Sequence, residues 1–388
     1  MKSNTKVIST VISLSAFSIA LFIAIFALLV SCQKQKAEWK GTIEVENGVT
    51  VVKNPKEPMY GEDVLRLEEE LSIGEPEGKE EYVFYRILMD VDEYGNIYVL
   101  DVAAPNIRVF DPEGNYKQTI GRKGQGPGEM LSPRSIQITP QNEIMVHDYR
   151  NSRFSFFSLD GNFIKQDLTA TAVFLSNPKM DSTGYIVGGI LRRESFVLNK
   201  FDIELNPVLT IYTIDIVRLS RTGEREVMIP SFSFDLTKKD NIICGYNDKY
   251  ELQIFDPQGK LTRKIIKEYD PLEVSEKDKE DFIDRLTGGR GFPPDEKVKF
   301  PKYHHPFSSI SVDEEGRIFV STPERVEGKD GSYYYDVFDP DGRCLAKMPI
   351  ELKDGRYPLL FRNKKLYFID EIEEGYEIVK RYKVTWKY

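Results

Sequence analysis

The sequence predicts an all-β protein, a six-bladed β-propeller with four-stranded antiparallel blades and a ring closed by an N-terminal strand in the last blade. Three observations lead to this fold class. A short apolar motif recurs six times, most copies are followed by an Asp-x-x-Gly turn, and the apolar runs are short or alternating with almost no helical period.

The recurring motif is clearest in EYGNIYVLD at residues 93–101, where polar turn residues precede a short apolar run. The first apolar residues of its six copies are Ile97, Ile144, Ile186, Ile242, Ile318 and Leu366. The spacings between them are 47, 42, 56, 76 and 48 residues. Most of these values are close to the length of one propeller blade.

Each repeat is expected to contain four short strands. In the first repeat the segments RILMDVD, NIYVLD, NIRVFD and YKQTIG are separated by Gly, Pro, Asn and Asp. The last two strands are joined by a tight turn of the form FDPEGN at 110–115, which returns as FDPQGK at 255–260 and FDPDGR at 338–343. Proline fixes one backbone angle of such a turn, and glycine supplies a positive φ.

The last repeat lacks a fourth strand. It supplies YPLLFR, LYFIDE and YEIVKRYKV before the chain stops at Tyr388. We expect the missing strand to come from GTIEVENGVTVVKN, residues 41–54, because pairing the two ends of the chain leaves few bare sheet edges.

The spacing of 76 residues between repeats four and five exceeds its neighbours and indicates an insertion. Within it, Ser275 is a suitable helix cap, Phe282 and Leu286 share a helix face, and Gly288 and Gly289 form a stop. We expect a short helix over the ring at about residues 275–286; the alternative is a solvated, charged loop.

The N-terminus has the order of a secretory signal. Lys2 and Lys6 precede an apolar run that ends in LVSC at Cys32. This ending resembles a bacterial lipobox, which implies lipidation of Cys32 and tethering to a membrane of the bacterial cell envelope, at its periplasmic side or on the cell surface. The alternative is an uncleaved transmembrane anchor over residues 11–30. We therefore divide the chain into a signal peptide (1–31), a tether (32–40) and a propeller (41–388) with a helical insertion at about 268–305.

The net charge and the cysteine content limit the classes of function that the protein can have. The net charge of −9 becomes −11 without Lys2 and Lys6, so the acidic body disfavours binding to nucleic acid. The two remaining cysteines, Cys244 and Cys344, lie in different repeats and are expected to be buried thiols, although an exported compartment would permit a disulfide.

The stretch GRKGQGPGE at residues 121–129 has the glycine content of a phosphate-binding loop. A phosphate loop needs a helix start after it, whereas this stretch runs between two expected strands and matches neither GxGxxG nor GxxxxGK[ST]. We interpret it as a connection between blades.

The unit in which YVLD leads to NIRVFD, then to a DxxGN turn and a GxxGxGxGE connector, resembles the NHL repeat. With the LVSC ending, the chain is similar to bacterial six-bladed β-propeller lipoproteins. The resemblance implies a binding or scaffold module without a cofactor. The alternative is a metal-dependent lyase or lactonase with its site in the central channel, although the adjacent His304 and His305 would share a metal only on a loop.

The long loops indicate where a ligand would bind. The second-to-third strand loops and the connections between blades share one face of a propeller, and in this chain they include every long segment. That face also collects cations and aromatic residues, and we expect it to bind an unknown protein, peptide or glycan ligand as a monomer. The candidate ligand-binding residues are Arg122, Lys123, Arg134, Tyr149, Arg150, Arg192, Arg193 and Tyr303.

Overall fold

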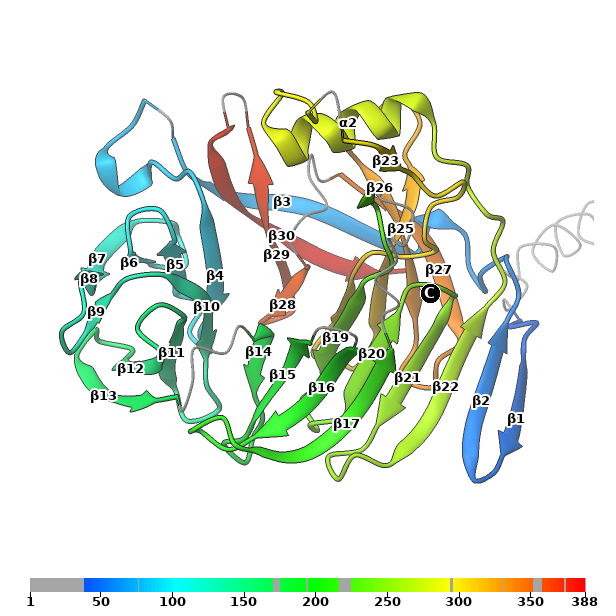
Figure 1. The fold of residues 1–388 in the computed structure, drawn as a ribbon, viewed down its shortest axis with the longest axis horizontal. Helices are drawn as coiled ribbons and strands as arrows, with labels where there is room; N and C mark the ends of the chain where they lie inside the picture. Colours follow the sequence, from blue (N-terminus) through cyan, green and yellow to red (C-terminus); the bar gives the residue numbers. More distant parts are fainter. Residues whose placement is uncertain are drawn as a thin grey trace, which may run out of the picture. The chain divides into compact units, whose positions relative to one another are not determined.

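The computed structural model describes residues 38–75, 77–169, 175–192, 195–215, 225–293, 296–329, 331–351, 358–372 and 375–387. Its strands form six blades around a central axis, each built on a four-stranded antiparallel sheet (Figure 1). The chain is a six-bladed β-propeller, as the repeats predict. The residues of the expected signal peptide and of its alternative, a transmembrane anchor, lie outside the described residues.

The first three blades follow one another along the chain. Blade one contains β4 (Ile87–Val91), β5 (Ile97–Asp101), β6 (Asn106–Phe110) and β7 (Tyr116–Ile120). Blade two contains β10 (Pro133–Ile138), β11 (Glu143–Asp148), β12 (Arg153–Ser158) and β13 (Phe163–Leu168). Blade three contains β14 (Ser176–Met180), β15 (Ile186–Leu191), β16 (Ser195–Phe201) and β17 (Pro207–Asp215).

The other three blades complete the ring. Blade four contains β19 (Phe232–Leu236), β20 (Ile242–Tyr246), β21 (Glu251–Phe255) and β22 (Leu261–Lys267). Blade five contains β24 (Ile310–Val312), β25 (Ile318–Arg325), β26 (Tyr333–Phe338) and β27 (Cys344–Ile350). Blade six contains β28 (Leu360–Arg362), β29 (Lys365–Glu371), β30 (Glu377–Trp386) and β3 (Leu65–Ile73).

An N-terminal strand does close the ring, but it is a different strand from the expected one. The outer strand of blade six is β3, which pairs antiparallel with β30. Residues 41–54 instead fold into a hairpin of β1 (Thr42–Glu46) and β2 (Val49–Asn54), and β2 extends blade four by pairing parallel with β22. The cause is Asn47-Gly48, whose positive φ angles of 51° and 81° form a tight hairpin turn within the segment.

The tight turns are formed as expected. In blade one, Asp92 Oδ1 accepts hydrogen bonds from the backbone N–H groups of Tyr94 and Asn96 at 2.9 and 2.8 Å. Gly95 completes this turn with a φ of 87°. The glycine-rich connection after β7 holds no helix; β8 (Arg122–Lys123) and β9 (Glu129–Met130) pair within it. It is a strand-to-strand connection and not a phosphate loop.

The hydrophobic core lies between the blades. The six clusters of buried apolar side chains correspond to the six interfaces between neighbouring blades, including the one between blades six and one. Cys244 lies in the cluster between blades three and four and Cys344 in the one between blades four and five. Both are free, buried thiols. The interface between blades six and one forms only when the ring closes.

The insertion contains the expected helix. Helix α2 spans Glu276–Thr287, begins after Ser275, which forms a capping box with Asp278, and ends at Gly288 in the left-handed conformation with a φ of 61°. After it, β23 (Val298–Lys299) pairs parallel with β18 (Arg225–Glu226), a strand of the connection between blades three and four. Among the described residues, no helix is long and apolar enough to cross a membrane.

Candidate ligand-binding site

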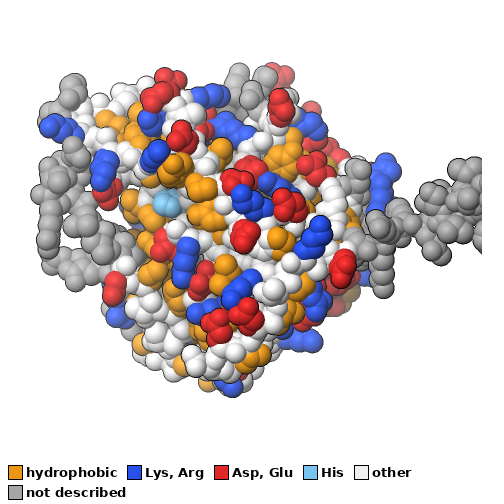
Figure 2. Space-filling view, turned by 90° about the vertical axis from the view of Figure 1, so that its right-hand side faces the viewer, with side chains coloured by type: hydrophobic (Ala, Val, Ile, Leu, Met, Phe, Trp, Pro, Cys, Tyr) orange, Lys and Arg blue, Asp and Glu red, His pale blue; other side chains and the backbone are white. Residues whose placement is uncertain are grey.

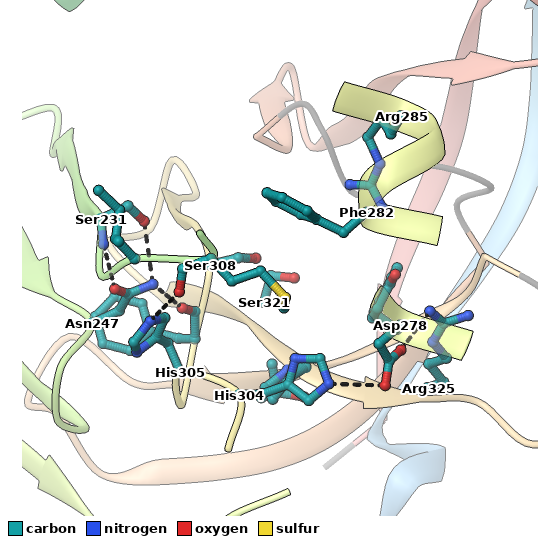
Figure 3. A pocket seen from close by; sticks show the side chains of 16 residues that line it. Ser231, Asn247, Asp278, Phe282, Arg285, His304, His305, Ser308, Ser321 and Arg325 are labelled. Atoms are coloured by element: carbon teal, nitrogen blue, oxygen red, sulfur yellow. Dashed lines mark hydrogen bonds and ion pairs between the residues drawn. The ribbon is translucent and has the colours of Figure 1, made fainter. Parts of the chain in front are cut away.

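A cavity of about 440 Å³ lies between blades four and five, beside helix α2 (Figure 3). Its walls come from second-to-third strand loops, from the insertion and from the connections that lead into β19 and β24. The cavity is therefore on the face that carries the long loops. Its lining residues are Met228, Ile229, Ser231, Asn247, Asp278, Phe282, Arg285, His304, His305, Phe307, Ser308, Ser321, Thr322, Pro323, Arg325 and Tyr333.

One wall is fixed by the buried side chain of Asn247, which follows β20. Its Oδ1 accepts the Ser231 backbone N–H at 2.6 Å, and its Nδ2 donates to the Phe307 carbonyl at 2.6 Å and to Ser231 Oγ at 3.2 Å. One amide thus joins the connections that enter blades four and five. Because all the hydrogen bonds of Asn247 go to groups of the wall, this residue fixes the shape of the cavity and is not itself a contact for a ligand.

The opposite wall is held by Asp278 on the first turn of α2. Its Oδ2 lies 3.1 Å from His304 Nε2 and 2.9 Å from the Ser275 backbone nitrogen, while its Oδ1 accepts from Arg325 Nη2 at 2.9 Å. Burial opposes ionisation here, but the hydrogen bonds from Ser275 and His304 outweigh it and lower the pKa of Asp278 to about 2. The carboxylate therefore stays charged and ties the helix to blade five.

His305 faces the first wall. Its Nε2 lies 2.7 Å from the carbonyl oxygen of Met228. A carbonyl only accepts, so Nε2 carries the hydrogen and Nδ1 is left as an acceptor. Burial lowers the pKa of His305, which keeps the ring neutral at pH 7.

The side chains available to a ligand are apolar, cationic or hydroxyl-bearing. Phe282 and Arg285 extend from α2 beside the cavity, with the Phe282 ring pointing toward Ser308 (Figure 3). Ile229, at the rim, is 52% exposed. An aromatic ring, an aliphatic rim and a guanidinium beside hydroxyl groups can contact a ligand that has both apolar faces and polar edges.

The described residues contain no group of three or more His, Cys, Asp or Glu side chains that could hold a metal ion. His304 and His305, the pair weighed for a metal, point to different partners, Asp278 and the Met228 carbonyl. Asp278 is occupied by its histidine, arginine and cap partners.

None of the seven predicted binding residues that the structure describes lines this cavity. Arg134 lies at the start of β10 and lines a second cavity in the central channel. Tyr149 and Arg150 lie in the turn after β11, and Arg192 follows β15. Arg193 lies outside the described residues.

The other predicted residues lie elsewhere on the long loops. Arg122 pairs with Glu129 at 2.8 Å, and its neighbour Lys123 is exposed. Tyr303 is 39% exposed, and Lys302 Nζ lies 4.8 Å from the centroid of its ring.

The sequence predicts helix α2 and the shared face of Phe282 and Leu286, but not that this helix lines a cavity. Phe282 lines the cavity, and Leu286 is 48% exposed. Asn247 and Ser308 were not predicted at all. The signal that could have indicated them is their position, since both follow or precede strands on the face of the long loops.

The surface charges are mixed. On the side of the molecule shown in Figure 2, acidic and basic side chains of the described residues alternate over the surface and do not separate into two regions. This part of the surface offers no extended basic patch for a phosphate backbone.

Known proteins share this fold. Residues 79–205 match a family model described as a 6-bladed beta-propeller. A member of the DUF4221 family from Bacteroides vulgatus has a similar structure, with 14% identity, a TM-score of 0.51, and coverage of 84% of this chain and 100% of that one. A protein of Bacteroides fragilis described as a candidate exported protein is similar too, with 13% identity, a TM-score of 0.51, and coverage of 87% and 100%.

More distant is virginiamycin B lyase from Staphylococcus aureus, at 9% identity and a TM-score of 0.42 over 82% of this chain and 99% of that one. The chain matches no curated protein. The family model and the two Bacteroides structures agree with the architecture seen here and show the fold alone.

Proposed function

We propose that the protein is an exported, membrane-tethered β-propeller that binds a ligand in the cavity between blades four and five and helix α2. The observation that carries this proposal is the insertion itself. A propeller needs only a short connection between blades, yet here a capped helix is held beside the cavity by the contacts of Asp278 with Arg325 and His304. Long loops on a rigid scaffold are where binding residues concentrate.

The contacts favour a peptide or a glycan as the ligand. A cavity of about 440 Å³ is in the range of ordinary small-molecule sites. Phe282 and Tyr333 offer aromatic faces, and Ser308 and Thr322 offer hydroxyl groups at the lining. Sugars and short peptides combine apolar patches with hydrogen-bonding groups in this manner.

Lipidation of Cys32 would provide the tether, supported by the LVSC motif after the apolar run. The similar Bacteroides fragilis structure, described as a candidate exported protein, fits the same location. To test the tether, the Cys32→Ala variant is expressed in a bacterium supplied with labelled palmitate. Loss of the label and of membrane fractionation is expected; labelling equal to that of the unaltered chain would contradict lipidation.

The binding proposal is tested with the full-length protein, purified in detergent, on arrays of oligosaccharides and short peptides. Hits are then measured with Phe282→Ser and Arg285→Ala, and with Glu280→Ala as the matched control on an exposed part of the same helix that does not line the cavity. Removing an aromatic contact should weaken binding at least about tenfold, which corresponds to about 1.4 kcal/mol. Equal binding by all three variants would refute this site.

A further inference from the structure

The central channel holds a second cavity, of about 190 Å³, formed mainly by the first strands of blades one, two, three and six, together with Ile369 of β29. We propose that it binds the carboxylate of a small organic acid with a short hydrocarbon body. The cavity is separate from the one beside α2, and no residue that the structure describes lines both. This proposal therefore stands independently of the binding function proposed above.

Two carboxylates interact with the cations of this cavity, Asp90 in its lining and Asp235 as the partner of Lys179, and both already accept backbone hydrogen bonds. Asp90 Oδ1 accepts the Val91 N–H at 2.8 Å and lies 3.3 Å from Arg362 Nη2, and its Oδ2 accepts the Ile138 N–H at 2.8 Å. Asp235, which pairs with Lys179, also accepts the backbone N–H of Val312 at 2.9 Å. Neither carboxylate needs a further donor.

Hydrogen-bond donors remain in excess. Arg134 is exposed at the rim and forms no ion pair with another described residue. Arg362 has five N–H donors, of which the described contacts use one toward Asp90 and one toward the Phe361 carbonyl at 3.1 Å. Lys179 adds an ammonium group with three donors, of which one goes to Asp235. Among the described residues, Arg362 is paired with Asp90 and Lys179 with Asp235, so Arg134 leaves one positive charge at the cavity without a carboxylate partner. The group that would complete this set of donors is an anion.

The walls are ordered before any ligand arrives. Gln137 on β10 accepts the Met180 backbone N–H at 2.7 Å and donates to the Met180 carbonyl at 3.1 Å, which fixes blade two to blade three. The bond from Ile138 to Asp90 does the same between blades one and two. The cations are therefore carried on strands held in register, so little ordering opposes binding.

The shape favours a carboxylate with hydrocarbon attached. Leu88, Ile136, Leu360 and Ile369 form apolar walls beside the cations. A volume of about 190 Å³ equals that of about six waters at roughly 30 Å³ each, enough for an acid of about four to six carbons. A guanidinium matches the planar carboxylate with paired hydrogen bonds, whereas inorganic phosphate would leave the apolar walls without contact.

The test is calorimetric titration of the full-length protein, in detergent, with hexanoate, 1-hexanol and inorganic phosphate. Hexanoate is expected to bind at least tenfold more tightly than either of the others. Arg134→Gln should weaken hexanoate binding at least tenfold, and Arg134→Lys should restore part of it. Arg86→Gln is the control, since Arg86 is an exposed cation before β4 that does not line the channel cavity.

Several results would overturn the proposal: no hexanoate binding, equal binding of hexanol or of phosphate, or an Arg134→Gln variant that binds hexanoate as the unaltered protein does. Phe282→Ser separates the two sites. It should leave hexanoate binding unchanged, and a matching loss in that variant would place the acid beside α2 and also overturn the channel site.

Discussion

His147 gives the stability of the protein a pH dependence that one substitution can isolate. The residue lies on β11, is 1% exposed, and stacks on Phe154 with 4.9 Å between ring centroids. Its Nδ1 is buried without a hydrogen-bond partner among the described residues. Burial lowers the pKa of His147 from 6.5 to about 4, and the neighbouring Asp148 carboxylate offsets only part of this effect.

The sign follows from which state binds the proton. Below pH 6.5 the unfolded chain protonates this histidine, whereas the folded protein does not until the pH nears 4. The folded state therefore loses stability as pH falls through that window. From the two pKa values, the free energy of unfolding falls by about 2 kcal/mol between pH 7 and pH 5. Once the pH is below both pKa values, the total loss is about 3 kcal/mol.

The assay is urea unfolding of the protein and of its His147→Leu variant at pH 7 and pH 5. Other titrating groups, including His305, are common to both proteins, so their effects cancel in the difference. Between pH 7 and pH 5, the free energy of unfolding of the variant should rise by about 2 kcal/mol relative to that of the unaltered protein. A difference that stays the same at both pH values would show that His147 is not held neutral by burial.

Three further predictions concern the scaffold. Deleting residues 41–53 should leave a folded, protease-resistant ring of lower thermal stability. Deleting β3 should expose the edge of blade six and give a protease-sensitive chain. Equal protease resistance of the two deletion variants would refute the assignment of the closing strand. Asp278→Ala should speed hydrogen exchange in α2 by removing a cap that contributes about 1 kcal/mol, with Glu280→Ala as a control that leaves exchange unchanged. Gly342→Ala should destabilise the protein more than Gly184→Ala in denaturant melts. Both glycines have positive φ, but only at Gly342 would an added Cβ atom lie 2.6 Å from Ile265. Equal losses of stability would contradict the close approach of Gly342 to Ile265.

The blades could be predicted from sequence because their signals are local. Asp92 and Gly95 lie within one turn, and the hydrogen bonds that form the turn join residues at most four positions apart. The helix start at Ser275 is local in the same sense. The wrong prediction of the closing strand also has a local cause, since Asn47-Gly48 is a hairpin signal within residues 41–54.

The candidate site could not be predicted in the same way. Asn247 contacts the Phe307 carbonyl across 60 positions of sequence, and Arg325 reaches Asp278 across 47. These contacts depend on how the insertion settles over blade five, which no pattern within either segment indicates. The sequence predicted which face carries the long loops, and only the arrangement of those loops in space placed the cavity.

The closing strand also sets the order in which the protein can fold. Leu65 of β3 pairs with Trp386 of β30, so this sheet forms only after nearly the whole chain is present. Contacts between residues so far apart in sequence form slowly, because a long loop must close before they are made. Until then β3 has no partner, and the apolar interface between blades six and one stays open to water. Among the strands of the ring, β3 is therefore synthesised first but is one of the last to pair.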